Sequence, residues 1–212
     1  MIDLHTHTVF SDGELIPSEL VRRAVTFGYR GIGITDHVDY TNIEHVLSCV
    51  KKAKYMEEVM DIKVLSGVEL THVHPAKIAP LAKMAKELGA EIIVVHGESP
   101  VEPVAPGTNA AAVACEDVDI LAHPGFLTTE EAQMALDNDV CIEITARNGH
   151  NRTNGHVARI ANEVGATMVV DTDTHSPDNL ITKETALKVA MGAGLTESQA
   201  KQVLENSVRF IQ

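Results

Sequence analysis

Short apolar runs recur along this chain, and most of them end in a histidine or a carboxylate. Apolar segments of about four to six residues predict buried strands. Six histidines and three acidic residues lie at or soon after the ends of such segments: His5, His7, Asp12, His37, Glu69, His96, His123, Asp173 and His175. The ends of many strands converge only in a barrel or an open α/β sheet, so the pattern predicts one shared active face.

Between these positions the chain alternates strands with helices. We expect strands near residues 2–5, 31–35, 63–69, 91–95, 119–122, 141–145 and 167–172. We expect helices near residues 17–27, 42–60, 76–88, 107–115, 129–138, 154–164, 183–192 and 196–205. The strands are apolar on both faces, which suits a parallel sheet covered by helices. Seven alternating strands predict a closed or nearly closed α/β barrel, with an open doubly wound sheet as the alternative.

Composition limits the partners. The 212 residues suit a single domain, residues 1–212, and their formal net charge is −13 with no run of Lys and Arg. An acidic surface repels a phosphate backbone, so nucleic-acid binding is disfavoured, although bound divalent metals would reverse the charge locally. Aromatic residues make up only 3% of the chain, which also disfavours a platform on which bases stack.

The sequence also bears on compartment and redox state. No stretch approaches the roughly 18 apolar residues that a membrane helix needs, so we expect no membrane partner. Because the first strand already begins at Ile2, we expect no signal peptide and a cytoplasmic location. Cys49, Cys115 and Cys141 form no CxxC pair and are expected to be small buried apolar residues. The sequence does not indicate an oligomeric state.

Spacing at two strand ends supports a metal site. Residues i and i+2 of a strand point the same way, so His5 and His7 can reach one ion together. Asp173 and His175 repeat this spacing, and Asp12 lies in a polar turn that can fold it back onto the same ion. Any one of these histidines could be a hydrogen-bonded core residue. That six of seven predicted strands end this way argues for a shared metal site instead.

The order of these motifs resembles that of a known family. The matching segments are DLHTHTVFSDG at 3–13, TDH at 35–37, GVE at 67–69, His96, HPG at 123–125 and DTDTH at 171–175. Over essentially its whole length the chain resembles the PHP (polymerase and histidinol phosphatase) family. The resemblance implies a (β/α)7 distorted TIM-like barrel and phosphoesterase activity. It also implies two or three divalent metal ions clustered at the C-terminal ends of the strands.

Carried over residue by residue, the nine ligand positions of the family fall on the six histidines and three carboxylates named above. Asp12 stands where some members have His, a difference that can change metal preference or the occupancy of a third site. Imidazoles with carboxylates suit Zn, Mn or Fe better than Mg or Ca, and nine ligands are too many for one ion. Glu69 is expected to bridge two ions. Asp3 and Asp36 are expected to orient the histidines, with turn hydrogen bonding as the alternative.

The resulting hypothesis is hydrolysis of a small phosphomonoester, with histidinol phosphate or a similar metabolite as the substrate. A metal-bridging hydroxide held by Glu69 and Asp173 would attack phosphorus in line with the leaving oxygen. One alternative is a phosphodiesterase or 3′-exonuclease, as similar domains serve within DNA polymerases. The other is a non-catalytic structural module. The negative charge weighs against the first, and the complete ligand set weighs against the second.

The strand near 141–145 carries no predicted ligand, and its exit holds candidates for phosphate binding. Arg147 can grip phosphate oxygens with two donors, with a surface ion pair as the alternative. His150 is a weaker candidate for phosphate contact or leaving-group protonation, with an exposed loop histidine as the alternative. His72 and His74 are expected at the substrate mouth or on the plain surface. Glu143 is expected to face either the barrel interior or a helix.

Overall fold

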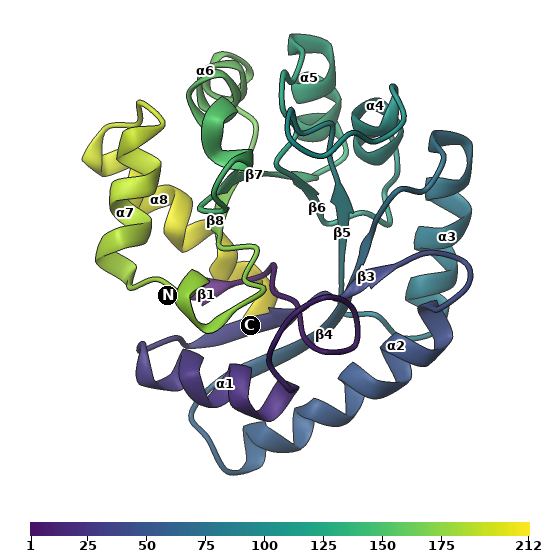
Figure 1. The fold of residues 1–212 in the computed structure, drawn as a ribbon. Coiled ribbons are helices and arrows are strands. Elements are labelled where there is room, and N and C mark those ends of the chain that lie inside the picture. Colours follow the sequence, from purple (N-terminus) through teal and green to yellow (C-terminus); the bar gives the residue numbers. More distant parts are fainter.

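Seven parallel strands form a nearly closed barrel with the helices outside it (Figure 1). The computed structural model describes residues 1–212. Along the barrel the strands follow chain order: β1 (Ile2–Asp3), β2 (Gly31–Ile34), β4 (Lys63–Leu70), β5 (Ile92–His96), β6 (Ile120–Ala122), β7 (Cys141–Thr145) and β8 (Met168–Asp171). A short extra strand, β3 (His37–Val38), pairs with β4 off this path. The order never reverses, so the predicted barrel is confirmed over the doubly wound sheet.

Eight α-helices surround the strands, and four 3-10 segments complete the chain. The α-helices are α1 (Pro17–Thr26), α2 (Ile43–Val50), α3 (Pro75–Glu87), α4 (Thr108–Val113), α5 (Thr129–Asp137), α6 (Asn154–Val164), α7 (Lys183–Gly192) and α8 (Glu197–Asn206). The 3-10 segments are η1 (Lys51–Glu58), η2 (His150–Thr153), η3 (Pro177–Asn179) and η4 (Ser207–Ile211). None of the helices combines the length and apolarity that a membrane crossing requires.

The predicted helix over 42–60 is wrong in its second half. The α-helix ends at Val50, and residues 51–58 continue as the 3-10 segment η1. Within η1 only Ala53 and Met56 are buried. They are three residues apart, and residues at this spacing eclipse one another along a 3-10 helix. The 3-10 winding therefore turns both side chains to the core.

Local signals explain where several helices begin. Pro17 occupies the first turn of α1, where a missing N–H costs nothing. At the start of α5, the Thr128 side chain accepts from the Glu131 amide while the Glu131 carboxylate accepts from the Thr128 amide. Thr196 and Gln199 form the same reciprocal pair at α8. Each pair satisfies two N–H groups that a helix start leaves without partners.

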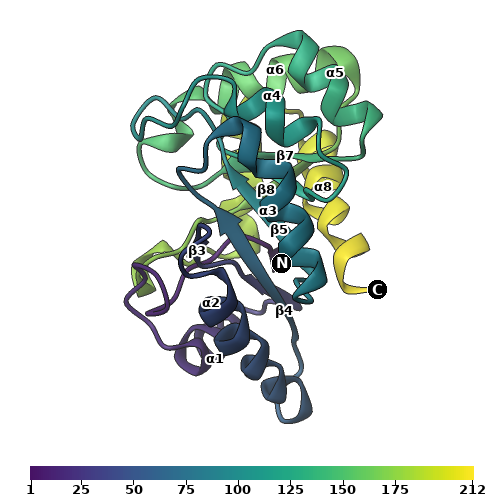
Figure 2. The same cartoon turned by 90° about the vertical axis from the view of Figure 1, so that its right-hand side faces the viewer.

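The core has two layers, one outside the barrel and one inside. The outer layer, of 53 buried residues, fills the space between strands and helices. The inner layer is only nine residues: Ile2, Leu4, Leu65, Ile92, Val94, Ile120, Ala122, Cys141 and Val169. Phe210 and Ile211 of η4 pack against this layer where β1 and β2 begin, and Figure 2 shows the C-terminus on the side of the barrel opposite β3. Toward the C-terminal ends of the strands, beyond this inner layer, the barrel interior is polar.

The seam between β1 and β8 is closed by side chains as well as backbone. One isolated bridge links Thr6 to Thr174. Below it, the Asp3 carboxylate accepts from the Thr172 amide (3.1 Å) and hydroxyl (2.6 Å). The Asp171 carboxylate accepts from the Leu4 amide (2.7 Å). Two fully buried carboxylates thus take the place of ladder hydrogen bonds, and burial raises the pKa of Asp3 to about 6.

Removing one of these acceptors should loosen the barrel. We expect Asp3→Ala to lower the free energy of unfolding by about 1–3 kcal/mol, because two buried Thr172 donors lose their acceptor. Asp3→Asn should cost less, since the amide keeps an oxygen for the Thr172 N–H. Urea denaturation of both variants, with exposed Asp61→Ala as control, measures the difference. Equal stability of Asp3→Ala and the wild type would contradict the closing role.

Candidate metal centre

All nine side chains predicted as ligands meet at the end of the barrel that the C-terminal ends of the strands form. Glu69, in β4, lies at their centre and has no exposed surface. Its Oε1 lies 3.2 Å from His96 Nδ1, 3.4 Å from His5 Nε2 and 3.7 Å from His123 Nε2. Its Oε2 lies 2.6 Å from His37 Nδ1 and 3.6 Å from His7 Nε2. One carboxylate therefore contacts five histidines from four strand ends, as a bridging ligand would.

Asp173 forms a second centre opposite Glu69. Its Oδ1 lies 3.2 Å from both His7 Nε2 and His175 Nδ1, and 3.7 Å from His5 Nε2. Its Oδ2 lies 3.7 Å from His123 Nε2. Asp173 and His123 both adopt positive φ, +52° and +28°. Non-glycine residues with such backbone angles cluster at functional sites, where surrounding contacts hold them.

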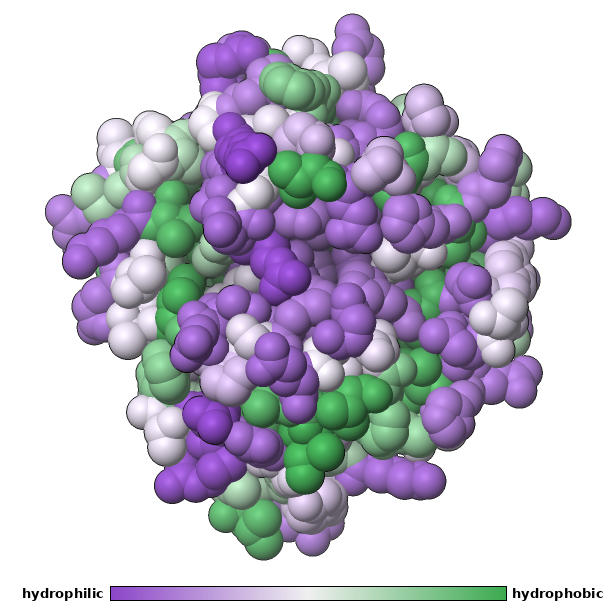
Figure 3. Space-filling view, viewed as in Figure 1, coloured by the Kyte–Doolittle hydropathy of each residue, from purple (hydrophilic) through white to green (hydrophobic).

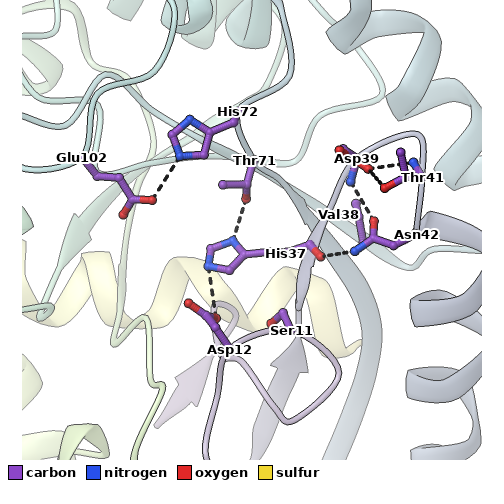
Figure 4. Close-up of a pocket in the computed structure, with 10 residues that line it drawn as sticks. All are labelled: Ser11, Asp12, His37, Val38, Asp39, Thr41, Asn42, Thr71, His72 and Glu102. Atoms are coloured by element: carbon purple, nitrogen blue, oxygen red, sulfur yellow. Dashed lines mark hydrogen bonds and ion pairs between the residues drawn. The ribbon is translucent and has the colours of Figure 1, made fainter.

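Asp12, His37 and His175 form the outer, more open part of the centre. The Asp12 carboxylate lies 3.2 Å from His175 Nε2 and 3.4 Å from His37 Nε2. Figure 4 shows Asp12 pointing at His37 from the turn below it. That turn is held by Asp36, which accepts from the Thr8 amide and hydroxyl and from the Ser11 hydroxyl.

The nine side chains divide into overlapping groups whose ligand atoms lie within 4.8 Å of one another. The groups are His7–Asp12–His37–His175, His5–His123–Asp173, His5–His7–Glu69 and Glu69–His96–His123. Each holds three or four nitrogen and carboxylate ligands, a number and chemistry that suit a transition-metal ion. The overlaps at Glu69, His5, His7 and His123 fit a cluster of ions better than a single one.

The polar atoms of the site supply an independent test of fit. Twelve buried side-chain nitrogen and oxygen atoms in the protein lack a hydrogen-bond partner, and nine of them belong to the predicted ligands. Buried polar atoms without partners are rare, because each one costs free energy. Divalent cations would satisfy the lone pairs that point inward. The residues present therefore fit a metal cluster.

The histidines of the centre differ in the direction in which their surroundings shift the pKa. Burial opposes the charged form of His5, but the Glu69 and Glu143 carboxylates raise its pKa well above the usual value. Burial and neighbouring His37 lower the pKa of His7 to about 3. For His175, burial is outweighed by Asp12 and Asp173, which raise its pKa to about 9. The cluster thus already holds positive charge between its carboxylates.

The two predicted phosphate-binding residues lie at the rim of the centre. Arg147 Nη1 donates to the Asp173 carbonyl (3.2 Å) and to Asn179 Oδ1 (3.1 Å). Its Nε lies 3.9 Å from Asp173 Oδ2. His150 opens η2 and is 7% exposed, with its ring 4.3 Å from the His123 ring. His150 is therefore part of the centre and not an exposed loop histidine.

Asp3 and Asp36 contact no imidazole ring. Asp3 bonds to Thr172 and lies 3.5 Å from the His5 amide, and Asp36 bonds to the turn at residues 8–11. Both side chains hold the backbone of segments that carry site residues. This is the turn hydrogen bonding that was the alternative to orienting the histidines. Instead, the carboxylate of Glu143, in β7, contacts the His5 ring, with Oε1 2.8 Å from His5 Nδ1.

A carboxylate that no sequence pattern selects comes from the long loop after β5 and lies over the centre. Glu102 lies 3.3 Å from His72 Nε2 and 3.9 Å from the Nε2 atoms of both His96 and His150. His72 is exposed, and its ring stacks on His96 at 5.9 Å. His72 therefore lies at the mouth, whereas His74 accepts from Ala76 and caps α3. Their different roles depend on loop geometry.

A polar cavity of about 430 Å³ opens beside Asp12 and His37 (Figure 4). Nine of its ten lining residues are polar, among them Asp39, Asn42, Thr71 and Glu102. Figure 3 shows hydrophilic residues gathered around the hollow in the middle of this face. A cavity of this volume accommodates a small polar molecule.

Fold and site together define an α/β-barrel protein with a histidine- and carboxylate-rich centre for divalent metals. The family model of the PHP domain matches residues 3–111. A protein of Methanocaldococcus jannaschii, described as uncharacterized, is 53% identical over 204 residues, which cover 95% of this chain and 94% of that protein. The chain therefore belongs to the PHP family, whose members are metal-dependent phosphoesterases.

More distant relatives differ in their descriptions. The DNA polymerase/3′-5′ exonuclease PolX of Bacillus subtilis is 27% identical, and the match covers 93% of this chain but 38% of PolX. Ribonuclease P protein component 3 of Methanosarcina barkeri is also 27% identical, covering 95% of this chain and 84% of that protein.

Solved structures of low sequence identity share the fold. A chain of an archaeal ribonuclease P with mature tRNA has a TM-score of 0.73 at 16% identity, covering 98% of this chain and 89% of that one. Histidinol phosphate phosphatase of Lactococcus lactis, complexed with zinc, L-histidinol and phosphate, has a TM-score of 0.64 at 14% identity. That match covers 92% of this chain and 94% of the phosphatase. These likenesses support the barrel fold.

Metal binding should release protons, because an imidazole must be neutral to bind a cation. With its pKa raised to about 9, His175 holds a proton at neutral pH. Metal affinity should therefore rise with pH, by up to about tenfold per pH unit for each proton released. Calorimetric titration with Mn²⁺ in two buffers of different ionisation enthalpy counts the protons. Exposed His45→Gln is the control, and affinity that is independent of pH would contradict the expectation.

Proposed function

We propose that the protein is a metal-dependent phosphatase of a small phosphomonoester. The observation that carries this proposal is the set of nine unpartnered buried atoms on the ligand candidates, in a centre that opens onto a small polar cavity. The nine ligand candidates are proposed to hold two or three ions, with Zn, Mn or Fe favoured by the imidazoles. When bound, the ions would activate water as a nucleophile and neutralise phosphate oxygens. Histidinol phosphate or a similar metabolite is the proposed substrate class.

Arg147 is proposed to hold the phosphate. Its two hydrogen bonds from Nη1 fix the guanidinium against Asp173 and Asn179, while Nη2 keeps its donors for a ligand. This placement at the rim, next to a carboxylate of the centre, suits a side chain that orients an incoming phosphate. Burial lowers the pKa of His150, so its neutral ring suits a contact with phosphate better than proton donation.

A nuclease activity or a role within a ribonucleoprotein is the second candidate, favoured by similarity to PolX and to the ribonuclease P component. The charge of −13 and the carboxylates of Asp12, Asp39 and Glu102 around the mouth work against a long phosphate backbone. A non-catalytic module is a third reading. It has less support, because all nine positions keep their ligand-type residues.

Metal removal and a substrate panel test the proposal together. Chelation should lower phosphatase activity by at least about 100-fold, and Mn²⁺, Zn²⁺ or Fe²⁺ should restore it. The protein should hydrolyse phosphomonoesters, including histidinol phosphate, faster than a diester or single-stranded oligonucleotides. Faster cleavage of the oligonucleotide would favour the nuclease. Full activity after chelation, with no metal by elemental analysis, would contradict a metal-dependent reaction.

Arg147→Lys should raise KM for the phosphomonoester about tenfold, because a planar two-donor contact is replaced by a point charge. Steady-state kinetics on the best substrate of the panel measures this change. Arg152→Lys is the matched control, since Arg152 is an exposed arginine on the adjacent segment η2. Unchanged KM and kcat in Arg147→Lys would remove the proposed phosphate contact.

A further inference from the structure

Glu143 contacts two histidines of the site from inside the barrel. It is fully buried on β7, the strand that supplies none of the nine ligand candidates. Its Oε1 lies 2.8 Å from His5 Nδ1, and its Oε2 accepts from the His123 amide at 2.8 Å. His5 follows β1 and His123 follows β6, so one carboxylate links segments on both sides of its own strand.

The hydrogen bond to His5 fixes the position of a proton. A histidine that binds a metal through Nε2 is neutral and carries its proton on Nδ1, and this is the nitrogen that Glu143 Oε1 faces at 2.8 Å. The lone pair of His5 then lies on Nε2, which points between Glu69 Oε1 (3.4 Å) and Asp173 Oδ1 (3.7 Å). A neutral imidazole binds a metal through the nitrogen that carries no proton. Glu143 thus selects the tautomer of His5 that can bind a metal between Glu69 and Asp173.

The second hydrogen bond acts on backbone. His123 has a φ of +28°, outside the usual range for a residue with a side chain. The bond from its amide to Glu143 helps to hold this conformation, in which His123 Nε2 lies 3.7 Å from both Glu69 Oε1 and Asp173 Oδ2. The same carboxylate therefore aims the Nε2 atoms of His5 and His123 at the same pair of carboxylates.

We propose that Glu143 is a positioning residue that sets the His5 tautomer and the His123 backbone, so that both rings present Nε2 to the metal centre. The proposal rests on the metal centre of the proposed function, but it does not depend on the substrate. A buried carboxylate is costly, and a well-packed apolar side chain would fill the same space at lower cost. Its two hydrogen bonds give it a purpose that packing alone does not.

Glu143→Gln separates positioning from packing, because the two side chains have nearly the same shape. The Gln oxygen can accept from only one of its partners. If it accepts from the His123 amide, its NH₂ faces His5 Nδ1 and forces the proton of His5 onto Nε2. We expect metal affinity to fall about 10- to 100-fold. Competition with a chromophoric chelator measures affinity, and ¹⁵N shifts of the His5 ring in the Zn²⁺-loaded protein report which nitrogen carries the proton.

Glu91→Gln is the matched control. Glu91 also accepts from a strand amide, that of Ser66, but it lies at the opposite end of the barrel and meets no histidine. It should bind metal like the wild type. If Glu143→Gln does not fold, Glu143→Asp serves instead. It keeps the charge but is one methylene too short to reach both partners, so it should also weaken metal binding.

The outcomes separate this proposal from the proposed function. An unchanged His5 tautomer together with metal affinity within about twofold of the wild type would overturn the role of Glu143, whatever the activity. A shifted tautomer with weaker metal binding supports it, even if the protein hydrolyses no phosphomonoester. In that second case only the proposed substrate class fails.

Discussion

The contact on which the rest of the site depends is the approach of two buried carboxylates, Glu69 and Asp173, to the same set of imidazoles. Glu69 lies within the longest strand of the sheet, whereas Asp173 follows β8 at the seam of the barrel. The two meet only because the seam closes. Asp3 and Asp171 close it through Thr172 and Leu4, directly beneath the metal centre. The contacts that close the barrel therefore lie next to those that assemble the site, and buried acids take part in both.

Much of this arrangement could be predicted from the sequence. The strands, most helices and the nine ligand positions follow from local patterns, because six of the seven predicted strands end in a ligand-type residue of their own. Glu143 could not be placed in advance, although a signal existed. Side chains alternate between the two faces of a strand, so Glu143 lies on the same face of β7 as Cys141. Cys141 belongs to the inner layer, whereas Ile142 and Ile144 belong to the outer layer. Glu143 therefore points inward, but only the assembled barrel shows that His5 lies within its reach.

The loop residues were beyond prediction for a different reason. Glu102 comes from the proline-rich segment after β5, and nothing in its spacing indicates which way the side chain turns. In the fold it lies beside His72, His96 and His150. Similarly, the turn at residues 8–11 depends on Asp36, which is distant in sequence and bonds to Thr8 and Ser11. Such contacts are set by tertiary packing and not by local propensity.

The surroundings of Glu102 bear on how an acidic protein could take the proposed anionic substrate. Glu102 lies near the Nε2 atoms of three imidazoles, and the metal ions proposed for this centre would add positive charge there, whatever the net charge of the chain. Within a few ångströms the local groups outweigh distant surface acids, which solvent and salt screen. A single phosphate group is small enough to lie wholly inside this local field. A polynucleotide must also cross the acidic rim, so this geometry suits the proposed monoester better than a long backbone.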